Sequence, residues 1–196
     1  PNRRQRQMCI RDSGGVAYLA ENGWFDPARV QHVIIPEPLN KDRICIGHRG
    51  VWWAEIETKG RIAHGSMPFL GDCAVRHMTA VLQEMEDSLF PALAERRTAM
   101  PVVPEGARQS TLNINAIHGG LPEQEEDYTG LPSACVPDRC VITIDRRFLA
   151  EEELADVKGE ITELLDRLAA HRPDFSYEVR DPVSYTHLTL PTIRSV

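Results

Sequence analysis

The order of strand-like and helix-like segments constrains the fold of this chain more than any other feature of its 196 residues. Four segments alternate apolar and polar side chains, as strands with one buried face do; they are residues 51–58, 111–117, 140–148 and 175–179. Apolar residues recur at helical spacing over 73–86 and again from Leu154 to Leu168. The order strand–helix–strand–strand–helix–strand predicts an α+β, ferredoxin-like domain, with a four-stranded antiparallel sheet and two helices on one face.

The region before this domain has a different pattern. Val16 to Asn22 predicts the end of a helix, which Gly23 terminates. Val33 to Ile35 predicts a brief buried strand, and the run Pro36-Glu37-Pro38 ends it because residues next to proline are pushed away from helical conformations. Glu37 should therefore lie on a loop at the carboxyl end of a strand, where open α/β sheets bind ligands. We expect two units, residues 14–42 and 43–181.

The two ends of the chain share a coding property that natural segments should not have. One possible coding sequence for residues 3–12, read as its reverse complement, encodes residues 183–192. The DNA concerned resembles a transposase-type sequencing adapter. We therefore expect residues 1–13 and 182–196 to be artefact tails, which are left out of the fold. Residues 14–181 are then expected to be an interior fragment of a longer protein.

Composition argues against several classes of partner. The chain has 22 basic and 29 acidic residues, a formal net charge of −7. Without the tails, which hold five arginines and one aspartate, 17 basic residues face 28 acidic ones, a net charge of −11. Such a surface disfavours nucleic acid and anionic lipid, and no apolar run reaches the ~20 residues of a membrane span. The cysteines at 45, 73, 135 and 140 form no Cys-x-x-Cys pair; we interpret them as free thiols, which fits a reducing, cytoplasmic location.

Four positions could bind or catalyse, and each has an ordinary alternative. Glu37 could ligate zinc through a carboxylate oxygen, or be an exposed turn residue. His64 lies in a loop between a strand and a helix, where it could donate to an oxyanion, bind metal or move protons, or be structural. Asp145 and Arg147 share a strand face, so the arginine is either preset to grip a substrate carboxylate or part of a surface ion pair. Asn113 is either a pocket residue or the polar side of its strand.

Taken in order, a longer series of sequence pieces resembles a known family. The pieces are Ile35-Pro36-Glu37-Pro38, Gly47-His48-Arg49-Gly50, Gly60 to Pro68, Leu112-Asn113-Ile114 with Ile117-His118-Gly119-Gly120, Val136 to Cys140, and Asp145-Arg146-Arg147. The set is similar to the zinc-dependent exopeptidase/deacylase family that includes acetylornithine deacetylase, succinyl-diaminopimelate desuccinylase, aminoacylase and glutamate carboxypeptidase. Each piece alone has low specificity, but the ordered set covers essentially everything between the tails.

This resemblance implies a catalytic α/β domain that holds two zinc ions, and an inserted ferredoxin-like lid that mediates homodimerisation. Residues 14–42 would be the C-terminal piece of the first half of the catalytic domain, and residues 43–181 the lid. Glu37 would ligate the metal, with cobalt or manganese as alternatives to zinc. His64 would stabilise the tetrahedral oxyanion, in dimeric members at the partner subunit's active site. Asn113 and Arg147 would bind the carboxylate end of the substrate, Arg147 being preferred to Arg146 for its Asp-x-Arg spacing.

The activity implied for the parent protein is metal-assisted hydrolysis of an amide bond in N-acyl amino acids or small peptides. The fragment itself is expected to be inactive, because the other metal ligands and the general base would lie outside it. The alternative is a stand-alone ferredoxin-like module that dimerises or binds a ligand without catalysis. Glu37 and the strand before it favour the enzyme, since an independent lid would not carry a remnant of a catalytic domain. The acyl group and the amino acid stay open.

Overall fold

A computed structural model describes residues 18–26, 28–30, 49–120 and 134–183 of the chain. The chain divides into two compact units, residues 1–45 and 46–196, and each is described by itself. In the first unit, residues 18–21 are helical and the helix ends at Gly23, whose φ of 70° favours glycine. The Gly23 and Trp24 N–H groups donate to carbonyls of the last turn, which confirms the predicted helix end. The predicted strand at 33–35 and Glu37 lie outside the described residues.

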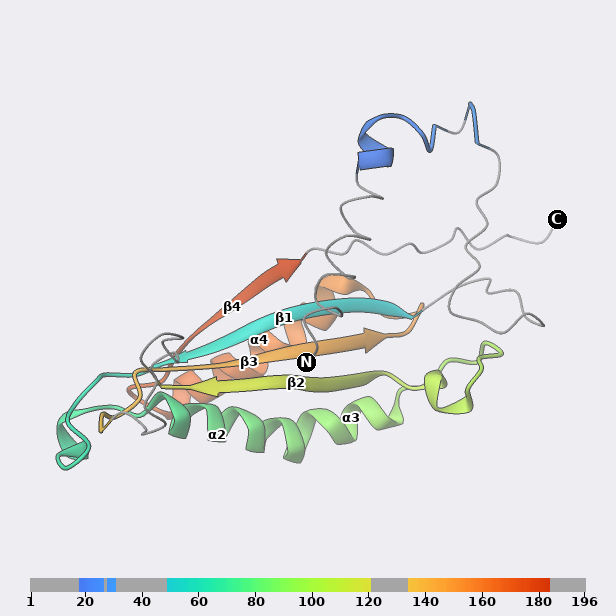
Figure 1. Cartoon of the computed structure of the whole chain (residues 1–196). Helices are drawn as coiled ribbons and strands as arrows, with labels where there is room; N and C mark the ends of the chain where they lie inside the picture. Colours follow the sequence, from blue (N-terminus) through green and yellow to red (C-terminus); the bar gives the residue numbers. More distant parts are fainter. Residues whose placement is uncertain (1–17, 27, 31–48, 121–133, 184–196) are drawn as a thin grey trace. The chain divides into compact units, whose positions relative to one another are not determined.

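The second unit contains the predicted sheet. Its strands are β1 (Gly50–Lys59), β2 (Thr111–Gly119), β3 (Arg139–Phe148) and β4 (Ser176–Val183). They lie in the order β2-β3-β1-β4, and every neighbouring pair is antiparallel (Figure 1). The two central strands are therefore the first and third in the sequence, which is the ferredoxin-like arrangement that the element order predicts.

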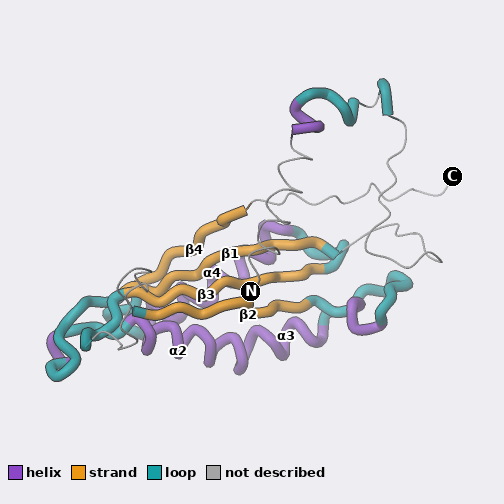
Figure 2. Tube along the Cα trace, viewed as in Figure 1, coloured by secondary structure: helices purple, strands orange, loops and turns teal. Residues whose placement is uncertain are grey.

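The helices cover one face of this sheet (Figure 2). They are α2 (Ala74–Glu84), α3 (Phe90–Glu95) and α4 (Leu154–His171). The sequence predicts that the first helix ends near residue 86 and that Pro91 begins an irregular stretch, which is wrong. A π-helical turn, Met85–Leu89, instead joins α2 to α3, and Pro91 falls in the first turn of α3. Proline is tolerated there because the first N–H groups of a helix need no intrahelical partner.

The core forms between the helices and the facing side chains of the central strands. On β1, Trp52, Ala54 and Ile56 are buried, as their alternation predicts. They pack in one cluster with the apolar stripes of α2 and α4; its fully buried members include Ile56, Met78, Val81, Met85, Ile142, Ile144, Val157, Ile161, Leu164 and Leu165. Side chains at the intervening strand positions lie on the sheet face away from the helices, here called the open face.

The start of α2 differs from its prediction. Asp72 is expected to cap this helix, but the N-cap residue is Cys73 and no side chain caps it. The Asp72 carboxylate accepts a hydrogen bond from His77 Nε2 instead, at 2.7 Å. The Asp72 carboxylate is hydrogen-bonded to His77 and not to the first N–H groups of α2, so the expected cap does not form.

The described cysteines are free, as expected, but they differ in burial. Cys140 is buried in the core, and this burial raises the pKa of its thiol. Cys73 and Cys135 are only partly buried. Within the described ranges, no helix has both the length and the apolar composition that a membrane crossing demands.

Candidate functional site

His64 lies on a loop whose base is closed by backbone hydrogen bonds. Arg61 and Asp72 pair across it, each N–H donating to the other's carbonyl at 2.8 Å. Gly60 stands at this base so closely that a Cβ there would lie 2.3 Å from the Asp72 carbonyl oxygen. We call residues 60–72 the His64 loop. Only glycine fits at position 60, so close backbone contacts fix where the loop begins and ends.

A second strip of chain holds the middle of the His64 loop. Gly65 N–H donates to the Ala134 carbonyl at 2.5 Å, and Val136 N–H donates to the Ala63 carbonyl at 2.8 Å. These bonds make a short antiparallel bridge between His64 and Cys135. The backbone of His64 is therefore fixed on both sides while its side chain stays exposed.

The contacts of the His64 ring decide which nitrogen can donate. The Ser66 backbone N–H donates to Nδ1 at 3.2 Å, and Ser66 Oγ lies 2.8 Å from the same nitrogen. A backbone N–H can only donate, so Nδ1 is the acceptor in the neutral ring and the proton sits on Nε2. Among the described residues Nε2 has no hydrogen-bond partner, so a neutral His64 presents one exposed N–H donor.

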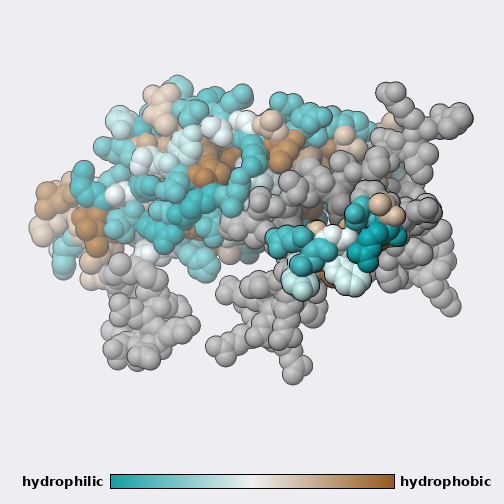
Figure 3. All heavy atoms as spheres, turned by 90° about the horizontal axis from the view of Figure 1, so that it is seen from above, coloured by the Kyte–Doolittle hydropathy of each residue, from teal (hydrophilic) through white to brown (hydrophobic). Residues whose placement is uncertain are grey.

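Apolar side chains surround His64 on the same loop. Ile62, Met67, Phe69 and Leu70 are exposed, Phe69 at 78% of its surface. Figure 3 shows hydrophobic side chains gathered at the end of the molecule where the His64 loop lies. Contiguous exposed apolar residues commonly mark a surface that another molecule covers.

Asn113, Asp145 and Arg147 lie together on the open face of the sheet. Asn113 pairs with Asp145 in the β2–β3 register, and Thr111 pairs with Arg147. The Arg147 guanidinium donates to both carboxylate oxygens of Asp145, at 2.6 and 2.9 Å. This bidentate pair fixes the plane of a guanidinium that is still 37% exposed, which leaves it able to meet a second carboxylate.

Arg49 adds a second cation to this end of the sheet, and sequence reasoning missed it. Its Nη1 donates to the Gln109 carbonyl at 2.9 Å and to Thr111 Oγ1 at 3.1 Å. Burial lowers the pKa of the Arg49 guanidinium, and the charge of Arg147 lowers it further. The sequence did hold a signal for Arg49. It lies one residue before β1, and the start of β1 pairs with the end of β3, where Arg147 lies.

A buried ionic cluster lies beneath Arg147. Arg146 is 1% exposed, donates to the Arg147 carbonyl at 2.6 Å and pairs with Glu152 at 2.9 Å. Arg96 bridges Glu152 and Glu160, and Ser110 donates to Glu152. We call Arg96, Arg146, Glu152 and Glu160 the Arg146 cluster. It ties β3 to α4 and to the chain after α3, and it anchors the backbone that carries Arg147.

The structure does not bring His64 and Arg147 together within one chain. Val51 pairs with Arg147 at one end of β1, and Lys59 pairs with Arg139 at the other. At about 3.3 Å per residue, the His64 loop begins roughly 30 Å from Arg147. Figure 1 shows this loop at the opposite end of the sheet from the tip of β3. Asn113 and Arg147 are thus neighbours, and His64 is remote from both.

No zinc site can be built from the described residues. None of their His, Cys, Asp and Glu side chains form a group of three or more that could hold a metal ion. Glu37, the predicted metal ligand, lies outside them. The ligands of the two-zinc centre that the family resemblance implies are expected outside the described residues, so no chemical step is derived through that centre.

Comparisons with known proteins agree on the kind of domain. A family model described as the peptidase dimerisation domain matches residues 46–173. A probable carboxypeptidase of Talaromyces marneffei is 29% identical over 164 residues, 79% of this chain and 31% of the relative. The uncharacterized protein YgeY of Escherichia coli is 28% identical over 176 residues, 89% of this chain and 38% of the relative.

A solved structure is similar in fold. The crystal structure of human carnosine dipeptidase 1 matches with a TM-score of 0.52 and 17% identity, over 70% of this chain and 37% of that one. The chain spans 31% and 38% of the length of the two relatives above, so each of them extends well beyond the matched part.

Proposed function

Because this chain belongs to the M20 peptidase dimerisation-domain family, we propose that it acts as the lid of a dimeric, metal-dependent hydrolase. The parent enzyme would hydrolyse the amide bond of N-acyl amino acids or small peptides. Relatives that are carboxypeptidases or dipeptidases by name support this reaction class. Residues 14–42 would be the catalytic-domain piece and residues 43–181 the lid. The isolated chain would be inactive, since it would lack most of the active site.

The observation that carries the proposal is the exposed Nε2–H of His64 on a fixed loop. A neutral imidazole that donates from Nε2 can stabilise the oxyanion of a tetrahedral intermediate, where charge develops only as the amide is attacked. Arg147, held flat by Asp145, would grip a substrate carboxylate through the outer edge of its guanidinium. Asn113, its neighbour on the open face, would donate a further hydrogen bond.

The separation of roughly 30 Å between His64 and Arg147 along β1 favours a site shared between subunits. The apolar surface around His64 would then be covered by the partner subunit, which is why it is exposed in one chain. We therefore propose a homodimer in which His64 of one subunit completes the site of the other. Glu37 remains the proposed metal ligand, with zinc as the expected metal. A cytoplasmic location is proposed from the free cysteines.

Mixing two inactive variants of the full-length enzyme tests this proposal. His64→Ala and Arg147→Ala should each lower kcat/KM for N-acyl amino acids by about 10²–10³-fold. If His64 acts on the partner's site, a mixed dimer holds one intact site and one doubly damaged site. Random reassociation should then restore about a quarter of the wild-type activity, because half of the dimers are mixed and each has one good site.

The outcome separates the competing functions. Two active single variants would remove His64 and Arg147 from catalysis. Two inactive variants that do not complement each other would place both residues in the same site of one subunit. A full-length protein that dimerises but hydrolyses no N-acyl amino acid or dipeptide with added zinc, cobalt or manganese would favour the binding module without catalysis.

A further inference from the structure

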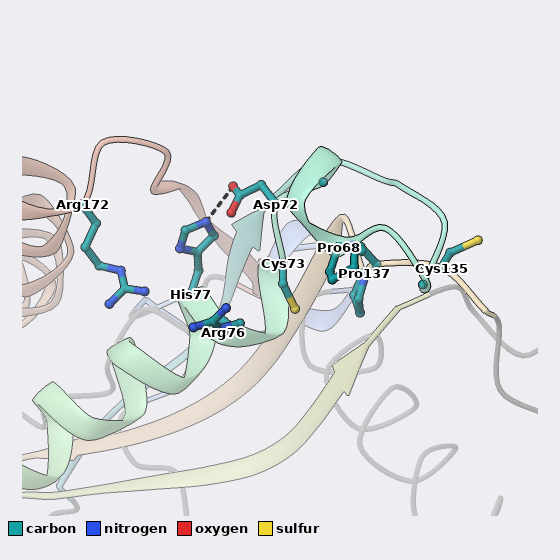
Figure 4. Close-up of a pocket in the computed structure, with 11 residues that line it drawn as sticks. Pro68, Asp72, Cys73, Arg76, His77, Cys135, Pro137 and Arg172 are labelled. Atoms are coloured by element: carbon teal, nitrogen blue, oxygen red, sulfur yellow. Dashed lines mark hydrogen bonds and ion pairs between the residues drawn. The ribbon is translucent and has the colours of Figure 1, made fainter.

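A cavity of about 520 Å³ lies behind the His64 loop, between that loop and the start of α2. Its walls include Gly65, Pro68 and Gly71 of the loop. Its charged or titratable lining residues are Asp72, Cys73, Arg76, His77, Cys135 and Arg172 (Figure 4). The residues come from the loop, from α2, from the strip before β3 and from the end of α4, so the tertiary fold gathers them.

One ring nitrogen of His77 is hydrogen-bonded, and the other has no hydrogen-bond partner among the described residues. Its side chain is 6% exposed, its Nε2 lies 2.7 Å from Asp72 Oδ2, and its ring packs edge-on against Phe175. Its Nδ1 is buried without a hydrogen-bond partner in the part of the chain that the structure describes. Because a carboxylate oxygen accepts, Nε2 must carry a proton. Nδ1 is then either a bare lone pair or, in the imidazolium, a second N–H donor.

Two arginines in the same cavity are also without partners. Arg76 and Arg172 make no side-chain hydrogen bond or ion pair with the described residues, although the chain has more acidic than basic residues. Figure 4 shows both guanidinium groups on the same side of the His77 ring, with Asp72 bonded to its other side. Arg76 is exposed and Arg172 is half-buried, so water reaches both guanidinium groups, and a carboxylate or phosphate that replaced this water would accept charge-assisted hydrogen bonds.

We propose that Arg76, His77 and Arg172 form a binding site for an oxyanion, the carboxylate or phosphate group of a small ligand. Guanidinium forks suit the paired oxygens of such groups, and an Nδ1–H on His77 would add a third donor. Two guanidinium groups and one carboxylate, that of Asp72, line the cavity, so its net charge favours an anion. The thiols of Cys73 and Cys135 are the other titratable groups among the lining residues.

One consequence follows from this geometry. The bound ligand contacts the wall that Gly65, Pro68 and Gly71 form, so an occupied cavity braces the His64 loop from behind. The site stands on its own residues and does not depend on the proposed hydrolase activity.

The test is a titration of the whole 196-residue chain with sulfate and with acetate, followed by NMR of the histidine side chains. We expect saturable shifts of the His77 signals with at least one of the two anions. Saturation by sulfate alone assigns the site to phosphate-like groups, and saturation by acetate assigns it to carboxylates.

Three variants sharpen the result. Arg172→Gln and Arg76→Gln should each weaken binding by about tenfold, since each removes a charge-assisted contact. Arg97→Gln removes another exposed arginine, which lies away from the cavity and has no side-chain ion pair with the residues that the structure describes, and it should leave the affinity unchanged. His77→Gln should weaken binding, because it removes the imidazole donor. The proposal is wrong if neither anion gives a saturable shift of His77, or if Arg97→Gln weakens binding as much as Arg172→Gln.

Discussion

The two ends of the sheet hold their candidate functional residues by different means. At the end that carries Arg147, side-chain charges set the geometry: Asp145 grips the guanidinium, and the buried Arg146 cluster anchors the backbone behind it. At the other end, backbone hydrogen bonds and a glycine contact set the path of the His64 loop, and the His64 side chain itself is exposed.

This difference suggests what each end is built to do. A guanidinium aligned by a carboxylate is prepared before any ligand arrives, which lowers the cost of ordering it on binding. A histidine that projects from a rigid, apolar loop is presented to a separate surface. In the proposed enzyme, the Arg147 end would bind the substrate, and the His64 end would insert into the other subunit.

Replacing Arg146 with methionine should have the largest effect, because it attacks the charged end of the sheet. The change keeps an unbranched apolar stem but leaves the half-buried Glu152 and Glu160 with Arg96 as their only cation among the described residues. Breaking a buried ion pair on one side costs about 3–5 kcal/mol of unfolding free energy. Urea denaturation should show this loss. NMR signals of His64 should not move, since its loop is held by other contacts.

An exposed ion pair supplies the control for that variant. Arg167 pairs with Glu84 at 3.2 Å while its side chain is 54% exposed. Arg167→Met should change the unfolding free energy by less than about 1 kcal/mol, since solvent screens such pairs. If both variants lower the unfolding free energy equally, the Arg146 cluster stabilises the protein no more than an exposed ion pair does. Side-chain charges would then not distinguish the Arg147 end from the His64 end.

The sequence predicts the secondary structure and fold of this domain better than it predicts the side-chain contacts. Alternation on the strands and the stripe from Leu154 to Leu168 predict the elements and their buried faces, because burial follows side-chain periodicity. The order of these elements along the chain predicts the ferredoxin-like sheet. The neighbourhood of Asn113 and Arg147 follows only from the pairing register of β2 with β3. The contacts of Arg49 and Arg96 escape prediction because their partners lie at least 56 residues away in the sequence. Asp72 misleads because its carboxylate pairs with His77, five residues further on, and does not cap α2.

Replacing Gly60 with alanine should have the next largest effect, and it attacks the backbone-held end. The new Cβ would lie 2.3 Å from the Asp72 carbonyl oxygen and 2.9 Å from Ala74 N, and backbone atoms cannot move aside cheaply. Overpacking of this kind costs about 1–3 kcal/mol. Urea denaturation should show that loss, and the NMR signals of His64 should shift while those of Arg147 stay in place.

Gly159 provides a matched glycine without such a neighbour. It lies inside α4, and a Cβ there would meet nothing within 4 Å. Gly159→Ala should therefore stabilise the protein by about 0.5–1 kcal/mol, the usual gain inside a helix. A stabilising Gly60→Ala would show that the His64 loop has room at its base and is not fixed by close contact.

Acid should weaken the Arg147 end before the His64 end, and this is the smallest of the three effects. Burial by itself raises the pKa of Glu152, but hydrogen bonds from Leu149 N–H, Ser110 and Arg96, with the charge of Arg146, outweigh it and lower the pKa below its ordinary value. A carboxyl group with a lowered pKa in the folded state stabilises the protein above its unfolded pKa. That contribution is lost as the pH falls through the folded pKa.

Urea denaturation at about pH 7 and at successive steps below about pH 4.5, the ordinary range of a glutamate, measures this contribution. The wild type should lose stability over the acid range, and Glu152→Gln should lose less, because it starts without the charge. Glu105→Gln, at an exposed glutamate whose side chain is 71% exposed, should follow the wild type. Equal acid losses in wild type and Glu152→Gln would mean that the Arg146 cluster does not stabilise the charged form of Glu152. The end of the sheet that carries Arg147 would then be held by packing, as the His64 loop is held by its backbone.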